Sequence, residues 1–369
     1  MIELAGLAPA PVCGMILSDF GAKVIRVDKV GSGLNYDVTA RGKRSIALNL
    51  KKPEGVDILR KLCGSADVLI EPFRPGVMER LGLGPDTLIK ENPRLVYARL
   101  TGFGQTGPYK DMAGHDINYL GLSGVLASLG RKHENPLPPV NLLADFAGGS
   151  FTCAMGIMAA LLERSSSGQG QVIDSCMVEG AAYVGSWLYA SRSMFVWGQP
   201  RGHNLLDSGA HFYETYKTKD GKYMCVGALE PQFYKIMQDK LNVNDDELPQ
   251  FDDFDEMKEK LSKIFSEKTR DDWCTIFDGT DACVSPVLEQ EEAGQHPQNK
   301  ARGSFLENGM PRPAPILSRT PAVASSSPNN LEFGSHTTEI LSEAGFNEKD
   351  INALLEKRII EQADIKSKL

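Results

Sequence analysis

The chain lacks the cysteine spacings and short motifs that mark several large enzyme classes. Its seven cysteines are scattered over 369 residues without a C-x-x-C pair, which predicts reduced thiols rather than a disulfide framework or a zinc site. A P-loop, a G-x-S-x-G elbow and an H-E-x-x-H helix are also absent. The sequence therefore gives no support for a phosphate-loop ATPase, a serine hydrolase or a zinc protease.

An excess of positive charge and long apolar runs are lacking as well. The formal net charge of −8 at pH 7 argues against a general nucleic-acid binder. No apolar run reaches the length of a bilayer-spanning helix, and no basic-then-apolar leader opens the chain. We therefore expect no nucleic-acid partner and no membrane span. What is present, 41% hydrophobic and 24% charged residues over 369 positions, is typical of a globular protein with two domains.

Apolar segments of strand length alternate with helical segments through the first hundred residues. Strands are predicted at 24–28, 45–50, 67–71 and 94–100, and helices at 53–63, 76–81 and 85–91. This alternation predicts a parallel sheet covered on both faces, with ligands at the carboxyl ends of its strands. The first turn, Gly6–Ala10, lacks the G-x-G-x-x-G pattern that seats a pyrophosphate, so no nicotinamide or flavin cofactor is expected.

A change of character near Trp197 divides the chain into domains. Residues 198–211 show no periodicity and are rich in Gly, His and Asn, which is typical of a linker. Beyond them, a hairpin pattern surrounds Lys219-Asp220-Gly221. We therefore expect a large ligand-binding domain at 1–197, a linker at 198–211, a small α+β domain at 212–300, a second linker at 301–334, and helices within 335–369 that return to the large domain.

Basic residues gather next to two of the predicted strands. Arg41, Lys43 and Arg44 precede one strand, and Arg74 and Arg80 follow another. Cations at strand ends suit a polyanionic ligand such as a nucleotide phosphate. A solvated basic rim without a ligand is the alternative, and composition does not decide between the two.

His115 and Asp145 are candidate bases of a single cleft. Two different bases that face each other suit removal of a proton from one face of a carbon and its return to the other. Asp145 comes just before a helix expected to start near Gly148-Gly149, whose free N–H groups can hold a developing negative oxygen. Two alternatives stay open: a structural histidine, and an aspartate that only caps its helix. The helix dipole would also lower the pKa of Asp145 unless burial offset it.

Longer stretches carry a resemblance that covers nearly the whole chain. They are Gly6–Pro9, Arg41–Ser45, Glu71–Arg74, Gly76–Glu79, Gly102–Gln105, Gly114–Tyr119, Asn141–Gly149, Gly168–Asp174, Val226–Tyr234 and Asp278–Cys283. In these stretches and in their order the chain resembles the class III CoA-transferase family, and within it the members that racemise acyl-CoA thioesters. The resemblance implies an α/β fold with a Rossmann-like, parallel-sheet large domain and a small α+β domain, in an interlocked homodimer.

The resemblance implies an isomerase, a racemase that interconverts the (2R) and (2S) epimers of 2-methyl-branched fatty acyl-CoA thioesters from bile-acid and branched-chain fatty acid metabolism. His115 would take the proton from the (2S) thioester and Asp145 from the (2R) thioester. Glu230 of the other subunit would orient His115, and Asn141 would support Asp145. The enolate oxygen would be held by backbone N–H groups near Asp145. No metal or organic cofactor is implied, since CoA is part of the substrate.

The same resemblance implies which residues contact CoA. Lys29 stands where the family usually has an arginine, so the bidentate fork is lost and weaker phosphate binding is expected. Arg74 and Arg80 would lie near the phosphates. The other implied contacts are Leu48, Asn49, Leu50 and Lys51 along the adenine and ribose, and Gly114, Asp116, Ile117, Asn118 and Tyr119 at the thioester. Asn49 replaces an aspartate of the family pattern.

Two alternatives remain beside racemisation. In a CoA-transferase of the same family, Asp145 would be a nucleophile that forms a mixed anhydride, and a glycine-run loop would shield it from water. Asn204–Ala210 contains no such run, and a transferase has no use for a second base at His115. A CoA-binding protein without catalysis is the other alternative.

The last three residues, Ser367-Lys368-Leu369, form a peroxisomal import tripeptide. We therefore expect recognition by the peroxisomal import receptor and a location in peroxisomes, with mitochondria as an alternative compartment.

Overall fold

The computed structural model describes residues 1–31, 37–325 and 331–363. They form two compact units. Unit 1 comprises the described parts of 1–125, 139–185 and 313–369, and unit 2 comprises 126–138 and 186–312. The boundaries expected from the sequence differ from these, since they left 126–138 and 186–197 in the large domain.

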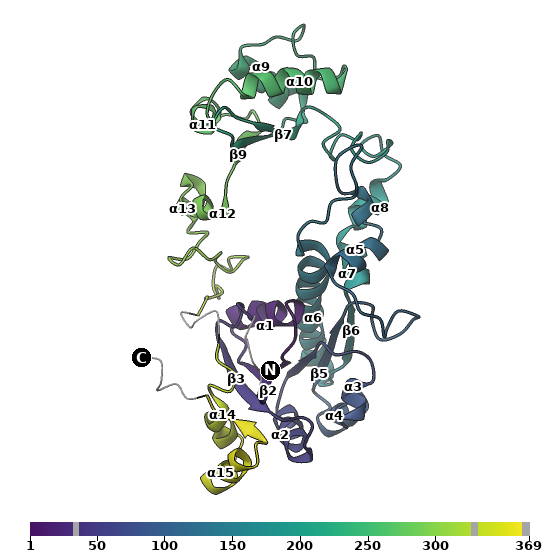
Figure 1. The fold of residues 1–369 in the computed structure, drawn as a ribbon, viewed down its shortest axis with the longest axis vertical. Helices are drawn as coiled ribbons and strands as arrows, with labels where there is room; N and C mark the ends of the chain where they lie inside the picture. Colours follow the sequence, from purple (N-terminus) through teal and green to yellow (C-terminus); the bar gives the residue numbers. More distant parts are fainter. Residues whose placement is uncertain (32–36, 326–330, 364–369) are drawn as a thin grey trace. The chain divides into compact units, whose positions relative to one another are not determined.

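A seven-stranded sheet forms the centre of unit 1 (Figure 1). Its order is β10-β3-β2-β1-β4-β5-β6, with β10 antiparallel to β3 and every other pair parallel, so the predicted parallel sheet is confirmed. The strand order reverses between β1 and β4, where doubly wound sheets bind ligands. The strands are β1 Ile2–Leu4, β2 Val24–Lys29, β3 Lys43–Leu48, β4 Val68–Glu71, β5 Val96–Thr101, β6 Val172–Cys176 and β10 Ile360–Glu361.

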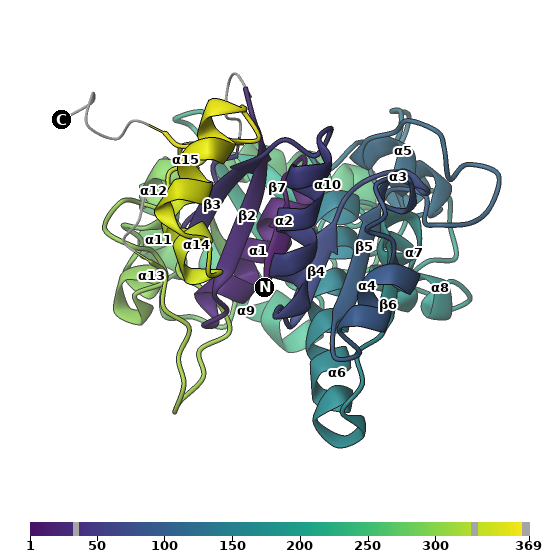
Figure 2. The ribbon, with the colours of Figure 1, turned by 90° about the horizontal axis from the view of Figure 1, so that it is seen from below.

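Helices cover both faces of this sheet (Figures 1 and 2). One face carries α1 Pro9–Asp19 and α6 Thr152–Ser167, and the other carries α2 Pro53–Gly64, α4 Pro85–Glu91, α14 Thr337–Glu343 and α15 Glu348–Glu356. Fully buried Ile46, Leu59 and Leu69 join strands to α2 in the core, and Leu341 joins α14 to it. Because the central strands are apolar along their length, both faces must be covered. Shorter elements are α3 Val77–Arg80, α5 Asp116–Leu122, the π-helix η2 Leu142–Phe151 and α7 Met177–Val184.

The helical segment that begins at Met177 is interrupted at Gly185. α7 ends at Val184, and α8 spans Ser186–Ser191. A Cβ at Gly185 would lie 2.7 Å from the Val125 side chain, so glycine permits a close approach at the break.

One helical stretch, Leu142–Ser167, has the length and apolar composition of a membrane span. The expectation that no apolar run reaches this length does not hold for this stretch. It joins η2 to α6, and α6 contacts β5 and β6 in unit 1. Its place is therefore that of a helix covering a sheet, and length and composition alone are weak evidence for a membrane.

Unit 2 is built on a three-stranded antiparallel sheet of order β7-β8-β9. The predicted hairpin is present, with Gly221 at φ +80° in its turn. Buried aromatic side chains of the helices, among them Phe265 and Trp273, fill its core. The elements are η1 Leu126–Ser128, α8, β7 Tyr213–Lys217, β8 Tyr223–Gly227, α9 Pro231–Leu241, α10 Phe254–Phe265, α11 Arg270–Phe277, β9 Val284–Val287, α12 Gln290–Ala293 and α13 Pro297–Arg302.

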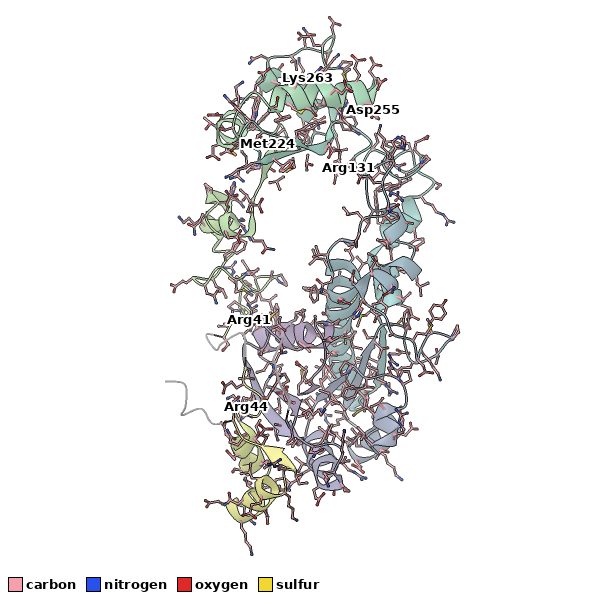
Figure 3. All side chains as sticks on the ribbon, in the orientation of Figure 1. Arg41, Arg44, Arg131, Met224, Asp255 and Lys263 are labelled. Atoms are coloured by element: carbon pink, nitrogen blue, oxygen red, sulfur yellow. The ribbon has the colours of Figure 1, made fainter. Side chains whose placement is uncertain are left out.

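Ion pairs hold the loop 126–138 in unit 2. Arg131 pairs with Glu214 at 2.6 Å, and Lys132 pairs with Asp255 of α10. Figure 3 labels Arg131 and Asp255. The sequence gives no sign of these pairs, because their partners lie far along the chain.

Candidate active site

A cavity of about 1000 Å³ lies at the carboxyl ends of the strands of unit 1. Its wall includes Ala5–Val12 after β1, Lys29 at the end of β2, Pro72–Arg74 after β4, and Gly102 and Phe103 after β5. These segments surround the point where the strand order reverses. The volume is at the upper end of the range for small-molecule pockets, so the cavity suits a large ligand.

His115 and Asp145 both line this cavity. His115 directly precedes α5, is exposed, and donates its backbone N–H to Oδ1 of Asn118 at 3.1 Å. Asp145 is half-buried within η2 and is close enough to His115 for an electrostatic interaction. The structure thus brings the two candidate bases to one cavity.

Asp145 lies inside a π-helix and does not cap one. The helix η2 begins at Leu142, and Asn141 occupies its N-cap position. The expectation that Asp145 precedes a helix starting near Gly148-Gly149 is therefore wrong, as is the alternative of a capping aspartate. Nδ2 of Asn141 donates to Oδ2 of Asp145 at 3.4 Å. π-helices are rare and occur often at functional sites.

The pKa of Asp145 is raised above its ordinary value of 3.8. Burial is the main cause; the hydrogen bond from Asn141 and the charge of His115 act to lower it, and the charge of Asp116 acts to raise it. Burial thus outweighs the influences that lower this pKa, the hydrogen bond from Asn141 and the charge of His115. A carboxylate with a raised pKa is the stronger base, which suits removal of a proton from carbon.

Asp116 does not belong to the cavity wall. Its side chain is only 4% exposed. Oδ1 accepts the backbone N–H groups of Ala144 and Asp145, each at 2.8 Å. These two N–H groups are therefore engaged within the protein, so an enolate oxygen would need other N–H groups near Asp145.

Tyr119 fixes the backbone that leads into His115. Its hydroxyl donates to the carbonyl oxygen of Gly114, and its ring packs edge-on against Phe103 with centroids 5.0 Å apart. A Cβ at Gly102 would lie 2.1 Å from the Tyr119 ring, so only glycine fits there. Gly114 and Tyr119 both line the cavity.

The residues implied for CoA binding divide into two groups. Lys29, Arg74, Gly114 and Tyr119 line the cavity. Leu48 is 1% exposed in the sheet core, and Asn49 donates its N–H to the carbonyl of Ile359, next to β10. The others outside the cavity wall are Leu50, Lys51, Arg80, Ile117 and Asn118. Lys110 also lines the cavity. The sequence analysis did not identify it, because its positive charge was its only signal.

The basic cluster at 41–44 is neutralised by carboxylates of the protein. The pairs are Arg41 with Asp19, Lys43 with Glu3, and Arg44 with both Glu339 and Glu343. The Lys43 and Glu3 side chains are completely buried. Figure 3 labels Arg41 and Arg44. These cations therefore stabilise the fold. Arg41 and Lys43 belong neither to a free polyanion site nor to a solvated basic rim.

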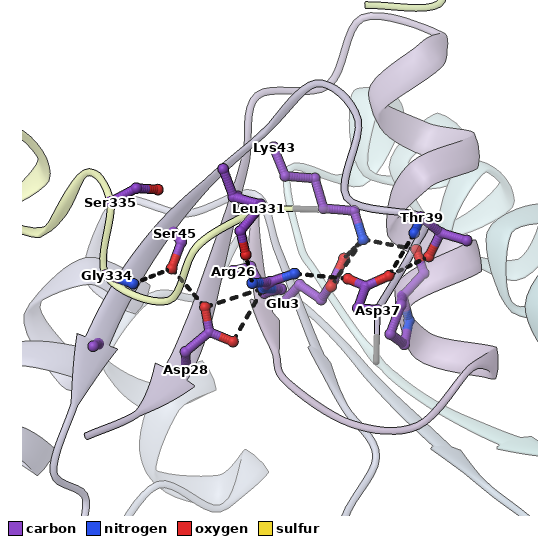
Figure 4. Close-up of polar contacts among 12 residues, drawn as sticks. Glu3, Arg26, Asp28, Asp37, Thr39, Lys43, Ser45, Leu331, Gly334 and Ser335 are labelled. Carbon is purple, nitrogen blue, oxygen red and sulfur yellow. Dashed lines mark hydrogen bonds and ion pairs between the residues drawn. The ribbon is translucent and has the colours of Figure 1, made fainter. Parts of the chain in front are cut away.

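A buried ion-pair network forms another part of the cavity wall (Figure 4). Arg26 donates from Nε to Asp28 at 3.1 Å and from Nη1 to Asp37 at 2.8 Å. Its Nη2 donates to the carbonyl of Leu331 at 3.0 Å, so the network also holds a segment from near the end of the chain. Ser45 donates to Asp28 at 2.5 Å.

Sequence analysis missed this network, although a signal was present. Arg26 and Asp28 are opposite charges two residues apart in an apolar strand, and such residues point to the same face. Their other partners, Asp37 and Leu331, are not predictable from spacing because they belong to different segments.

Glu230 belongs to unit 2, where it is exposed and directly precedes α9. Among the described residues, no group of three or more His, Cys, Asp or Glu side chains could hold a metal ion.

Comparisons with known proteins agree in one family. The model of CoA-transferase family III matches residues 1–335. A mouse alpha-methylacyl-CoA racemase is 56% identical over all of this chain and 98% of its own length, and the human alpha-methylacyl-CoA racemase is 54% identical over the same shares. Among solved structures, a CAIB/BAIF family protein from Brucella suis superposes with a TM-score of 0.78 at 25% identity, covering 93% of this chain and 97% of the other.

Proposed function

The chain belongs to CoA-transferase family III, and from this premise we propose that it interconverts the (2R) and (2S) epimers of 2-methyl-branched acyl-CoA thioesters. It is then an isomerase, an alpha-methylacyl-CoA racemase like its two mammalian relatives. The observation that carries the proposal at the site is the presence of His115 and Asp145 in the wall of one cavity. Bile-acid intermediates and branched-chain fatty acids supply substrates of this class.

The proposed reaction is a 1,1-proton transfer. His115 removes the proton from the (2S) thioester, the electrons move into the thioester as an enolate, and Asp145 returns a proton to the other face; from the (2R) thioester the roles reverse. The raised pKa of Asp145, caused first by burial, supports its role as a base and as an acid. Asn141 supports this carboxylate through its hydrogen bond. The chemistry draws on no metal or organic cofactor.

Three exposed cations suit the phosphates of CoA. Lys29, Arg74 and Lys110 line the cavity, and none of them forms an ion pair within the part of the chain that the structure describes. Lys29 offers a point charge where an arginine would offer two parallel hydrogen bonds, so its grip on a phosphate is weaker.

The proposed enzyme works as an interlocked homodimer in which Glu230 orients His115 of the partner subunit. An apolar stripe supports an interface: Phe151, Met155, Met158 and Leu162 are 52–74% exposed and spaced to share one helix face. Mixing subunits tests the arrangement. Dimers formed from His115→Ala and Glu230→Ala chains regain activity if Glu230 acts across the interface, and stay inactive if it acts within its own chain.

Import into peroxisomes through Ser367–Leu369 is part of the proposal, and these residues lie outside the described ones. Deleting the tripeptide and locating the protein in cells tests it: loss from peroxisomes supports import, while an unchanged location contradicts it and a mitochondrial signal would support the alternative.

Heavy water provides the decisive test of the activity. The purified protein is incubated with one epimer of a 2-methylacyl-CoA in D2O. Deuterium at the 2-position together with both epimers is the expected result. Acyl exchange with free acids and no label would replace the proposal with a CoA-transferase that uses Asp145 as nucleophile. If neither product forms, the protein binds CoA without catalysis.

A further inference from the structure

Asp116 is buried next to both proposed bases without reaching the cavity. It is the first residue of α5, directly after His115, and only 4% of its side chain is exposed. It does not belong to the cavity wall, so a CoA thioester has no access to its carboxylate. A contact with substrate, which the resemblance implied, therefore does not explain this residue.

The Asp116 carboxylate caps η2 from another part of the chain. Its Oδ1 accepts the N–H groups of Ala144 and Asp145, each at 2.8 Å. N–H groups in the first turn of a helix have no partner within that helix, and a carboxylate binds them strongly. Asp116 is thus joined to Asp145 by a hydrogen bond to its backbone and to His115 by a peptide bond.

We propose that Asp116 is a positioning residue that sets the separation of His115 and Asp145. The proposal rests on the proposed racemisation, in which one carbon exchanges its proton with both groups. A displacement of about 1 Å in such a site lowers a rate by roughly 100-fold. One carboxylate that links both base-bearing segments prevents such a displacement. Its other oxygen, Oδ2, has no hydrogen-bond partner among the described residues, so Oδ1 alone forms the link.

Two variants of Asp116 separate positioning from substrate contact. Asp116→Ala removes the link and is expected to lower kcat roughly 100-fold while KM stays unchanged. Asp116→Asn keeps an oxygen that accepts both N–H groups and is expected to restore most of kcat. Amide hydrogen exchange at Ala144 and Asp145 is measured in parallel: it should be faster in the alanine variant and restored in the asparagine variant. Asp86→Asn, the same change in the first turn of α4, is the control and should behave as wild type.

Other outcomes overturn the assignment. Wild-type kcat in Asp116→Ala would remove any positioning role, and a raised KM with unchanged kcat in both variants would make Asp116 a substrate contact. If circular dichroism shows that the alanine variant is unfolded, the asparagine variant decides: protected amides with retained kcat support the proposal, and protected amides with lost kcat contradict it. A wild-type protein without racemase activity would refute the proposed function, while the exchange data would still test the cap.

Discussion

Two parts of the cavity wall in unit 1 differ in how far their charged side chains are paired within the protein. In the ion-pair wall (Arg26, Asp28 and Asp37), Arg26 donates from all three of its nitrogens to protein oxygens. In the base wall (His115 and Asp145), Asp145 receives one long hydrogen bond from a side chain, and neither residue forms an ion pair within the described residues.

The difference separates charged groups that stabilise the cavity wall from groups that stay available to a ligand in the cavity. A buried cation whose donors all bind protein oxygens has no donor free for a ligand. Removing one member of such a pair leaves the other buried and unpaired, which is costly. A half-buried carboxylate with an unfilled lone pair has a raised pKa, caused first by burial, and can still accept a proton. Each prediction below changes one of the two walls.

His115→Ala is expected to have the largest effect on activity. It removes one of the two bases, and general acid–base catalysis contributes about 10²- to 10⁴-fold, so racemisation should fall by at least roughly 100-fold. CoA binding, measured by calorimetry, should persist because the cations of the cavity are intact. His296→Ala, in the N-cap position of α13, is the control. Unchanged turnover would refute the role of His115.

Arg26→Met is expected to damage folding instead. It leaves Asp28 buried without its partner, at a cost of about 3–5 kcal/mol in the free energy of unfolding. Urea denaturation measures the loss. Arg60→Met, which breaks the exposed pair with Glu91, serves as the control and should barely shift the midpoint. Equal midpoints for the two variants would show that the ion-pair wall does not stabilise the fold.

Lys29 provides a smaller, ligand-dependent effect. Lys29→Ala should weaken CoA binding by about tenfold, or roughly 1.4 kcal/mol, and Lys29→Arg should strengthen it because the guanidinium binds phosphate through two hydrogen bonds. Calorimetry at two salt concentrations checks both, since a phosphate contact weakens as salt rises. Equal CoA affinity for the wild type, Lys29→Ala and Lys29→Arg would place the phosphates elsewhere in the cavity.

The smallest effect concerns pH. Asp145 must be ionised to accept a proton, and its raised pKa, due first to burial, makes activity on the (2R) thioester fall at a higher pH than an ordinary aspartate would give. Asn141→Ala removes a hydrogen bond that lowers this pKa, so the acid limb of the pH–rate profile should move to still higher pH. A shift to lower pH would show that Asn141 does not stabilise the carboxylate.

Much of unit 1 was predictable because its signals are local. Apolar strands such as 67–71 and 94–100 alternate with helices, and β4 and β5 lie within a few residues of those ranges. The sequence also indicated His115 and Asp145, which the structure brings to one cavity, because the motif around each is continuous in sequence. Their surroundings were not indicated: the π-helix around Asp145 and the burial of Asp116 leave no mark in hydrophobic periodicity.

The sequence by itself determined the parallel sheet, its covered faces, the family and the two segments that carry His115 and Asp145, since periodicity and contiguous motifs encode short-range structure. Only the tertiary structure decided which charges are available. Lys43 forms an ion pair with Glu3, and Arg26 donates hydrogen bonds to Asp28, Asp37 and Leu331. Lys29 and Lys110 remain exposed. The physical reason is that a charge is paired by residues from distant positions in the sequence. The spacing of residues along the chain does not show which of them lie close together in space.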